Sequence, residues 1–338
     1  MTPVAPASPP GPGRPRISVR TGAPGSAITG LGHFRPDRVV TNADLSKTMD
    51  TNDEWIRSRV GIAERRFGGD EDTVVSMGAR AGAKALAEAG LQPGDIDTVI
   101  VATCSANSPV PHSATQIAGA LGIHAPGTFD LNAACAGFCY GIAAADQAVR
   151  VGAARNVLVV GSERLTDWTD PTDRTTAIIF ADGAGAAVVS AADEPGIGPV
   201  VWGSDETNIQ AIRVEGRNGH FIQEGQTVFR WATTAIAPVA IRAAEAAGVA
   251  LSDIDVLVTH QANLRIIDAV AKKIIAAGAR PDITVGRDIV TTGNTSSASI
   301  PIALDRMRAA GDVSSGELVL SVAFGAGLTY ASQVFRCP

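Results

Sequence analysis

The stretch "EAGLQPGDIDTVIVAT", residues 88–103, returns later in the chain as "EAAGVALSDIDVLVTH", residues 245–260. Each copy runs from an Ala-rich, helix-like segment through a polar turn into an apolar run typical of a strand buried on both faces. Similar apolar runs alternate with helix-like segments along most of the sequence, and this pattern predicts an α/β protein. The repetition indicates that the fold is built from two related halves.

Two further pairs of similar segments follow the first pair, in the same order in both parts of the chain. Residues 135–152, "CAGFCYGIAAADQAVRVG", resemble residues 294–311, "NTSSASIPIALDRMRAAG", and residues 180–189 resemble residues 324–334 at a shorter offset. Chance similarity between segments rich in Ala and Gly is the alternative, but it does not account for the shared order. We therefore expect two duplicated α/β halves whose mixed sheets pack against each other through shared helices.

The expected boundaries are a tail over residues 1–25, a first half over 26–195 and a second half over 196–338. The tail is rich in Pro and Gly and lacks the apolar segment of a secretory signal, so we expect it to be disordered.

Composition narrows the class of protein. The chain has 338 residues, 45% of them hydrophobic, which is enough for a substantial core. Its net charge of -6 argues against general nucleic-acid binding, which needs a basic surface. The sequence contains no run of about 18 apolar residues, so we expect no membrane-spanning helix. The four cysteines show no disulfide framework, so we expect free thiols and a cytoplasmic protein.

Cys135 lies where a strand-like segment passes through a turn of small residues into a predicted helix. A thiol at a helix N-terminus lies near the positive end of the helix dipole, which predicts a lowered pKa and a usable nucleophile. The plainer interpretation of a single cysteine is a small buried core residue, and Cys139, one turn later, fits that interpretation. No metal is expected, because Cys-x-x-x-Cys is not a usual zinc spacing and no second ligand pair lies nearby.

His260 and Asn294 are the candidates of the second half. His260 follows the strand of the second copy, at the edge where open α/β sheets bind ligands, and it can act as acid, base or hydrogen-bond donor. Asn294 falls opposite Cys135 when the halves are aligned, and its amide can hold an enolate oxygen. Taken singly, His260 also fits a structural histidine, and Asn294 fits a turn or N-cap residue.

Together these segments resemble the β-ketoacyl-acyl-carrier-protein synthase III family, condensing enzymes with the thiolase fold. The resemblance covers residues 26–338 and is carried by seven motifs: "TNDEWIRSRVGI", "ACAGF" at Cys135, "DPTDR", "FADGAGAAVV", "HQANLRII" from His260, "GNTSSASIP" around Asn294, and "FGAGLTY". It implies a homodimeric acyltransferase that needs no cofactor beyond its thioester substrates.

The resemblance also implies a two-stage reaction. Cys135 takes the acyl group of a short acyl-CoA as a thioester, and malonyl-acyl-carrier-protein then binds and loses CO2. The resulting carbanion attacks the acyl-enzyme to give a 3-ketoacyl product, which starts fatty-acid synthesis. In this scheme His260 and Asn294 donate hydrogen bonds to the malonyl thioester oxygen, and the backbone N–H groups of Cys135 and Ala326 form the oxyanion hole of the acyl-enzyme.

Further positions match the family's binding residues. By this resemblance CoA is contacted at five positions: Thr51, Trp55, Arg59, Arg174 and Asn263. The CoA adenine would lie between the indole of Trp55 and the guanidinium of Arg174. Three basic residues on a predicted helix suit the docking of an acidic carrier protein, although an ordinary solvated face would look the same: Arg265, Lys272 and Lys273.

The sequence departs from the family pattern in three places. The segment 203–228 is short, Val60 stands where a hydroxyl residue is often found, and Val110 occupies a position that reaches across the dimer to close the acyl pocket. These departures leave the primer's length and branching open.

Other functions fit parts of the sequence. A relative that primes a polyketide pathway, or transfers an acyl group to another acceptor, would use the same three residues. A degradative thiolase would need a second cysteine near the C-terminal Gly-rich turn, which has none. A binding protein without activity would be expected to lose Cys135 or His260, and a metalloprotein would use Cys135, Cys139 and a histidine.

Overall fold

Two five-stranded sheets with the same topology form the centre of the molecule. The computed structural model describes residues 18, 20–216 and 219–338. In spatial order the first sheet is β1 (Gly25–Phe34), β7 (Asp182–Ala192), β6 (Asn156–Arg164), β4 (Thr98–Ala102) and β5 (Gly127–Leu131). The second is β8 (Val201–Gly203), β14 (Thr329–Arg336), β13 (Leu318–Gly325), β11 (Val256–Thr259) and β12 (Thr284–Val285). In each order the first two pairings are antiparallel and the last two are parallel, so both sheets are mixed.

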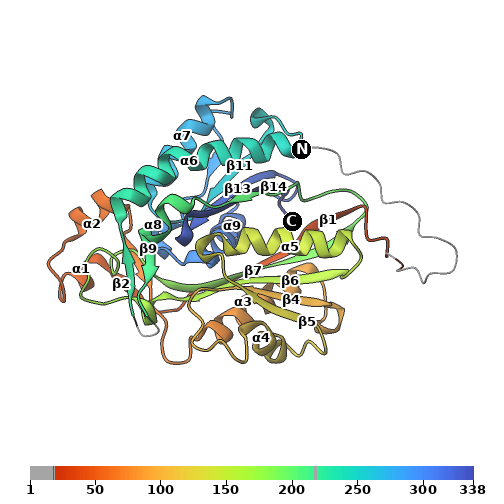
Figure 1. Ribbon diagram of the computed structural model, residues 1–338, viewed down its shortest axis with the longest axis horizontal. Coiled ribbons are helices and arrows are strands. Elements are labelled where there is room, and N and C mark those ends of the chain that lie inside the picture. Colours follow the sequence, from red (N-terminus) through yellow and green to blue (C-terminus); the bar gives the residue numbers. More distant parts are fainter. Residues whose placement is uncertain (1–17, 19, 217–218) are drawn as a thin grey trace.

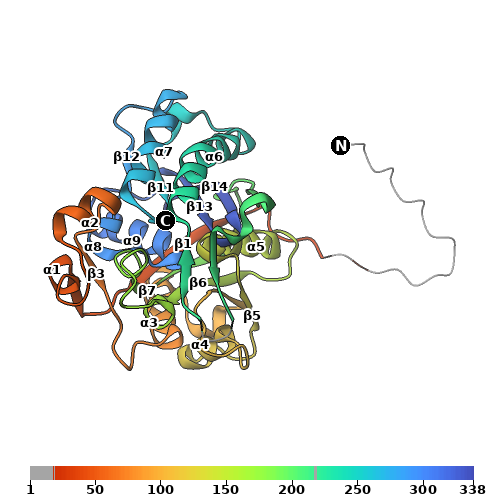
Figure 2. The same ribbon diagram turned by 60° about the vertical axis from the view of Figure 1, so that its left-hand side comes forward.

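Helices form three layers around these sheets, as Figures 1 and 2 show. The inner layer between the sheets is α5 (Gly137–Arg150) and α9 (Ser299–Ala310). The outer layers are α3 (Val74–Ala89) with α4 (Ser113–Leu121) on the first sheet and α6 (Gly225–Ala246) with α7 (Leu264–Ala276) on the second. The predicted α/β class with mixed sheets packed through shared helices is therefore confirmed.

One hydrophobic core joins the two halves through the inner helices. Ile142 of α5 and Ile300 of α9 belong to the same buried cluster as Val159 of the first sheet and Val258 of the second. Full burial of each such side chain stabilises the fold by about 1.5–3 kcal/mol. The close approach needs a glycine at position 161, because a Cβ there would lie 2.6 Å from the Ser297 carbonyl oxygen.

The structure corrects the alignment of the halves at the turn that carries Cys135. The 3₁₀ helices η2 (Ala134–Ala136) and η6 (Ser296–Ala298) correspond, since each precedes an inner helix and starts with a left-handed residue, Ala134 at φ 46° and Ser296 at φ 48°. Cys135 therefore lies opposite Ser297, not Asn294. The sequence match, which paired Gly152 with Gly311, was displaced by three residues, because Gly152 lies 18 residues after Ala134 whereas Gly311 lies 15 residues after Ser296.

The third pair of similar segments has a shorter offset because one connection is truncated. Residues 165–181 link β6 to β7, whereas only the 3₁₀ helix η7 (Ala326–Leu328) links β13 to β14. This difference places extra chain of the first half, including Arg174 and Phe180, at the carboxyl ends of the strands.

The described part of the predicted tail packs against the first half. Residues 1–17 and 19 of the tail lie outside the described residues, but Gly22 abuts the end of α5, where a Cβ would lie 2.1 Å from the Arg150 carbonyl oxygen. The expected boundary at 195/196 falls between β7 and β8. The parts of the chain that carry the two sheets are called the first and second half throughout; their division at this boundary and their origin by duplication stay predictions. In the described ranges no helix combines the length and the apolar character needed to cross a membrane.

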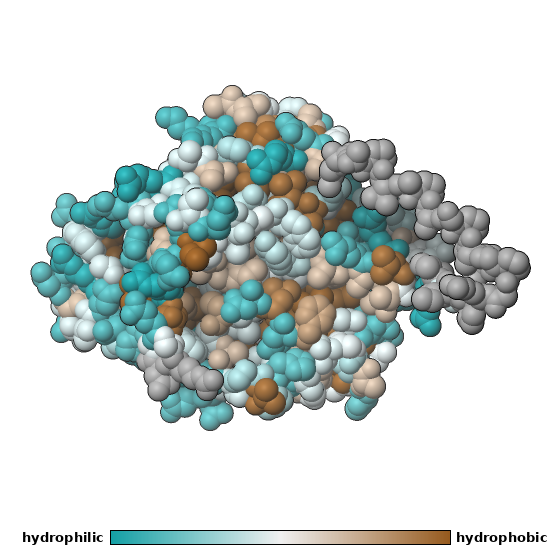
Figure 3. All heavy atoms as spheres, in the orientation of Figure 1, coloured by the Kyte–Doolittle hydropathy of each residue, from teal (hydrophilic) through white to brown (hydrophobic). Residues whose placement is uncertain are grey.

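Smaller elements cover the end of the molecule where the parallel strands finish. They are the hairpin β2 (Val39–Thr41) and β3 (Glu64–Arg66), the helices α1 (Asn42–Leu45), α2 (Asp53–Val60) and α8 (Ile289–Thr292), and the hairpin β9 (Ile212–Val214) and β10 (Phe221–Gln223). Hydrophilic residues cover the end that carries α1 and α2, whereas apolar residues gather along the middle of the same face (Figure 3). The short segment 203–228 thus contains the hairpin β9–β10.

Candidate active site

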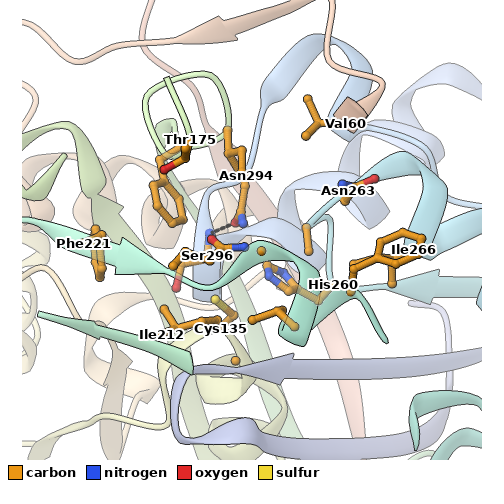
Figure 4. Close-up of a pocket in the computed structure, with 18 of the residues that line it drawn as sticks. Val60, Cys135, Thr175, Ile212, Phe221, His260, Asn263, Ile266, Asn294 and Ser296 are labelled. Atoms are coloured by element: carbon orange, nitrogen blue, oxygen red, sulfur yellow. Dashed lines mark hydrogen bonds between the residues drawn. The ribbon is translucent and has the colours of Figure 1, made fainter. Parts of the chain in front are cut away.

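A cavity of about 590 Å³ opens between the two halves, at the carboxyl ends of their parallel strands. Cys135 from the first half and His260 and Asn294 from the second all line it. In the close-up the three side chains point toward a common space (Figure 4). The structure therefore brings together the three residues for which the sequence predicts chemistry, as expected for ligand sites at strand ends.

Cys135 lies on η2, just before the first turn of α5. Burial raises the pKa of its thiol to about 12, although a hydrogen bond with Ser296 acts in the opposite direction. The lowered pKa expected from the helix N-terminus is therefore not what the structure indicates, because the removal of water from the thiolate is the larger effect. Burial thus favours the neutral thiol form of Cys135.

The Gly-rich turn after β13 presses against Cys135. Gly325 is extended, at φ -160°, and a Cβ on it would lie 2.5 Å from the Cys135 backbone nitrogen. Only glycine permits this approach. The next residue, Ala326, also lines the cavity. The predicted pair of backbone donors, Cys135 and Ala326, is therefore close in space, and their role in an oxyanion hole stays a prediction.

His260 follows β11 and is 2% exposed. Its backbone N–H donates to the Val322 carbonyl oxygen at 2.8 Å, and its ring lies edge-on to Phe324 with 5.2 Å between ring centroids. The Nδ1 atom lies 2.8 Å from Ser299 Oγ. Burial lowers the pKa of His260 to about 3, so the imidazole is neutral at physiological pH.

Asn294 is 5% exposed and is fixed by both its backbone and its side chain. Its backbone N–H donates to the Ile179 carbonyl oxygen, and its own carbonyl oxygen accepts from the Ala181 N–H. The side-chain Oδ1 accepts from the Ser296 backbone N–H at 2.8 Å, the bond drawn in Figure 4. Since the oxygen is occupied, the NH2 group is left to face the cavity.

Cationic and aromatic side chains surround the mouth of the cavity. The Arg174 guanidinium lies 5.0 Å from the centre of the Trp55 ring, and that of Arg59 lies 5.5 Å from it. Arg174 also donates to the Asp50 carbonyl oxygen at 2.9 Å. Arg230 lines the cavity as well, although no sequence motif singled it out. In an acidic protein this local positive charge suits a phosphorylated ligand.

The remaining predicted CoA contacts differ in their positions. Asn263 lines the cavity and caps α7, with its side chain accepting from the Arg265 N–H. Val60 also lines it and is 4% exposed. Thr51 is not among the lining residues, and its hydroxyl is buried without a hydrogen-bond partner among the described residues. Thr51 therefore has no direct contact with this cavity.

The predicted docking and pocket-closing residues lie mostly outside the cavity. Arg265 lines it and packs its guanidinium 4.9 Å from the centre of the Phe229 ring. Lys272 and Lys273 are exposed farther along α7. Val110 is 79% exposed on the loop after β4, away from the lining residues.

A buried carboxylate lies behind the cavity and was missed by the sequence reasoning. Glu163 is 0% exposed and accepts hydrogen bonds from the hydroxyls of Ser105 and Ser297 at 2.5 and 2.8 Å. It also accepts from the Cys104 backbone N–H at 3.1 Å, and Cys104 lines the cavity. Its position at the end of the apolar run of β6 was the available signal, because a carboxylate there must be paired or hydrogen-bonded.

Two serines next to the predicted residues were also missed. Ser296 contacts Asn294, and its hydroxyl lies 3.6 Å from Cys104 Sγ. Ser299 contacts His260. Both lie in the Ser-rich run "NTSSAS", residues 294–299, of which only Asn294 was singled out from the sequence.

In the parts of the chain that the structure describes, no three His, Cys, Asp or Glu side chains lie close enough together to bind a metal ion, so the metalloprotein alternative gains no support. Cys139 is buried in the shared core, with its sulfur 3.9 Å from Ser321 Oγ, so it does not reach the cavity.

Comparisons with known proteins agree with this geometry. Residues 129–206 match the family model described as 3-oxoacyl-[acyl-carrier-protein] synthase III, and residues 244–337 match the model of its C-terminal part. The chain is 50% identical over 317 residues to β-ketoacyl-[acyl-carrier-protein] synthase III 2 of Streptomyces avermitilis, covering 93% of this chain and 99% of the relative. It is 46% identical to the β-ketoacyl-[acyl-carrier-protein] synthase III of Streptomyces glaucescens, covering 96% and 99%.

Solved structures show the same similarity. The priming β-ketosynthase of the R1128 polyketide biosynthetic pathway superposes with a TM-score of 0.93 at 41% identity, covering 96% of this chain and 99% of that one. The 3-oxoacyl-[acyl-carrier-protein] synthase III of Aquifex aeolicus superposes with a TM-score of 0.88 at 36% identity, covering 93% and 100%.

Proposed function

The chain belongs to the β-ketoacyl-acyl-carrier-protein synthase III family, and on this premise we propose how its pocket performs the condensation that starts fatty-acid synthesis. The enzyme is an acyltransferase that joins an acyl-CoA primer to malonyl-acyl-carrier-protein. The observation that carries the assignment of residues is the convergence of Cys135, His260 and Asn294 on one cavity.

In the first stage the Cys135 sulfur attacks the carbonyl carbon of the acyl-CoA. The C–S bond to CoA breaks, the proton of the Cys135 thiol passes to the departing CoA sulfur, CoA leaves as its thiol, and the acyl group stays on Cys135 as a thioester. The backbone N–H groups of Cys135 and Ala326 stabilise the negative oxygen of the tetrahedral intermediate. The arginines at the mouth, Arg59 and Arg174, hold the phosphates and adenine of CoA, with Trp55 stacked on the base.

In the second stage the C–C bond to the malonyl carboxylate breaks and CO2 leaves. The electron pair moves into the thioester as an enolate, whose oxygen receives hydrogen bonds from His260 and from the Asn294 NH2 group. Each such donor in a water-poor site is worth about 100- to 1000-fold in rate. The enolate carbon then attacks the acyl carbonyl, the new C–C bond forms, and the Cys135 thiolate is released and protonated. The reaction as written uses no cofactor besides the two thioesters.

We also propose that the enzyme is a homodimer joined at β5. This strand pairs with β4 alone in the described residues, so its other edge is open, and Phe129 on it is 43% exposed. An open edge strand pairs readily with the same strand of a second copy. A two-fold axis between the copies would give the unpaired backbone groups of both β5 strands hydrogen-bond partners. The exposed Val110 loop would then reach the partner's acyl pocket. Sedimentation velocity should show a dimer, and a Phe129→Lys variant should be monomeric.

The carrier protein is proposed to dock on Arg265, Lys272 and Lys273, since Arg265 lies at the cavity and the two lysines are exposed farther along the same helix. A cytoplasmic location is part of the same proposal, supported by the four free cysteines, because a reduced Cys135 is required.

The test of the function is intact-mass spectrometry with a panel of acyl-CoAs, with and without malonyl-carrier protein. We expect an acyl adduct on the native protein and none on Cys135→Ala, followed by release of CO2 and a 3-ketoacyl product when malonyl-carrier protein is added. Acyl-Cys135 formation without decarboxylation would contradict the condensing reaction.

Priming of a polyketide pathway is the second candidate, favoured by the similarity to the R1128 priming β-ketosynthase. Both functions use the same chemistry on different carrier proteins. The comparison of kcat/KM for malonyl groups on a fatty-acid carrier and on a polyketide carrier distinguishes them.

A further inference from the structure

Ser299 forms a hydrogen bond with Nδ1 of His260, the ring nitrogen that does not face the cavity. Its hydroxyl oxygen lies 2.8 Å from Nδ1, and Ser299 is 2% exposed at the first position of α9. The other side of the imidazole faces the space shared with Cys135 and Asn294 (Figure 4).

The hydrogen bonds around Ser299 decide which atom carries the shared proton. The Gln261 backbone N–H donates to Ser299 Oγ at 3.3 Å, so the serine oxygen already accepts one bond. The side-chain NH2 group of Gln261 does not compete for Ser299, since it donates to the Thr259 and Gly286 carbonyl oxygens. Ser299 has a single hydroxyl hydrogen, and among the described residues Nδ1 is the one acceptor with which it forms a hydrogen bond.

Two assignments are then possible. If the Ser299 hydroxyl donates, Nδ1 accepts and the ring hydrogen is on Nε2. If Nδ1–H donates instead, the buried hydroxyl hydrogen has no acceptor among the described residues, which is unfavourable. The first assignment satisfies every group.

We propose that Ser299 is a positioning residue that fixes His260 as the Nε2–H tautomer, and so presents a hydrogen-bond donor to the enolate oxygen. This inference rests on the proposed function and extends it. It makes His260 a donor in the decarboxylation step and not the base that removes the Cys135 proton. The Phe324 ring, edge-on to the imidazole, restricts the ring to the same orientation.

The tautomer is read directly by 15N NMR of the wild-type protein labelled at histidine, with the His260 signals assigned by their absence in His260→Asn. We expect a protonated, pyrrole-like Nε2 and an unprotonated, pyridine-like Nδ1. The reverse pattern, or one signal averaged between the two tautomers, overturns the proposal.

Kinetics test the consequence for the reaction. We expect Ser299→Ala to slow malonyl-carrier-protein decarboxylation about 10- to 100-fold through lost orientation of the donor, while acylation of Cys135 stays within about 3-fold. Ser299→Thr, which keeps the hydroxyl, should restore both the rate and the tautomer. Ser332→Ala is the matched control, because Ser332 is also fully buried and donates to a backbone carbonyl, that of Ser321.

An equal loss of both stages in Ser299→Ala, or no rescue by a folded Ser299→Thr, overturns the positioning role. If the wild type neither acylates Cys135 nor decarboxylates the malonyl group, the proposed function fails instead, and the NMR experiment still decides the tautomer.

Discussion

The side-chain oxygen of Asn294 accepts the backbone N–H of Ser296 at 2.8 Å, and this bond turns the NH2 end of the carboxamide toward Cys135 and His260. The orientation matters because only the NH2 end can donate to a developing enolate.

Asn294→Asp keeps the size and the bond to Ser296 but replaces the donor with a second oxygen. We expect decarboxylation of malonyl-carrier protein to fall about 100- to 1000-fold, because a carboxylate repels the enolate that the amide stabilises. Acylation of Cys135 should change much less, since that stage uses the backbone N–H groups. CO2 release and intact mass measure the two stages, and a parallel loss of both would contradict the assignment.

Burial of His260 predicts a dependence of stability on acid. The unfolded chain protonates this histidine below about pH 6.5, whereas the folded chain keeps it neutral down to about pH 3. The unfolded state therefore binds more protons than the folded state between these pH values, and the free energy of unfolding falls as pH falls. The largest contribution of His260 to this slope is about 1.4 kcal/mol per pH unit. Urea titrations at pH 6.5 and pH 5 should show a weaker decline for His260→Gln. Equal declines in both proteins would mean that His260 is not held neutral.

The strand-end residues were predictable because the sequence carries the pattern of buried parallel strands. His260 follows such a run directly, and Cys135 follows another through a short turn, so both were placed correctly at the edge that holds the cavity. Asn294 was selected partly for a wrong reason, since Ser297 and not Asn294 corresponds to Cys135. Its motif within the family resemblance was the better signal.

The contacts that orient these groups were not predictable, because they join segments far apart in the chain. Glu163 meets Ser297, and the direction of the Cys135 pKa depends on how fully the packed halves exclude water. A sequence pattern locates a thiol at a helix start, but it does not report the local dielectric. Thr51, selected because it matches a CoA-contact position of the family, does not line the cavity, and its contact with CoA stays a prediction.

Arg174 is predicted to move when CoA binds. It lies 5.0 Å from the centre of the Trp55 ring, a stacking distance that leaves no room for a base between them, so the adenine must displace it. We expect Arg174→Met to raise KM for acyl-CoA about 10-fold with kcat nearly unchanged, because the adenine is remote from the reacting atoms. Arg57→Met is the control, since Arg57 is exposed on the same helix as Trp55 and pairs with Asp53. A fall in kcat with constant KM would place Arg174 in the chemistry instead.

The docking proposal predicts a selective effect of charge reversal on α7. Lys272→Glu with Lys273→Glu should raise KM for malonyl-carrier protein at least about 10-fold and weaken its dependence on salt, while acylation by acyl-CoA stays unchanged. Arg155→Glu makes the control, because Arg155 is exposed just before β6, at the opposite end of the sheet from the cavity. Steady-state kinetics at two salt concentrations measure this. If Arg155→Glu and the double variant act alike, net charge and not a docking site governs the association.

Glu163 is predicted to stabilise the junction of the halves behind the nucleophile. Its fully buried carboxylate accepts hydrogen bonds from Ser105 and Cys104 of the first half and from Ser297 of the second. Glu163→Ala leaves several buried donors without an acceptor, each costing about 1–3 kcal/mol, so we expect the free energy of unfolding to fall by about 3 kcal/mol or more. Glu163→Gln keeps one acceptor oxygen and the side-chain shape, and it should recover part of this loss in urea titrations monitored by fluorescence. Equal stability of the Gln and Ala variants would show that the shape of the side chain, and not its hydrogen bonding, is what the junction requires.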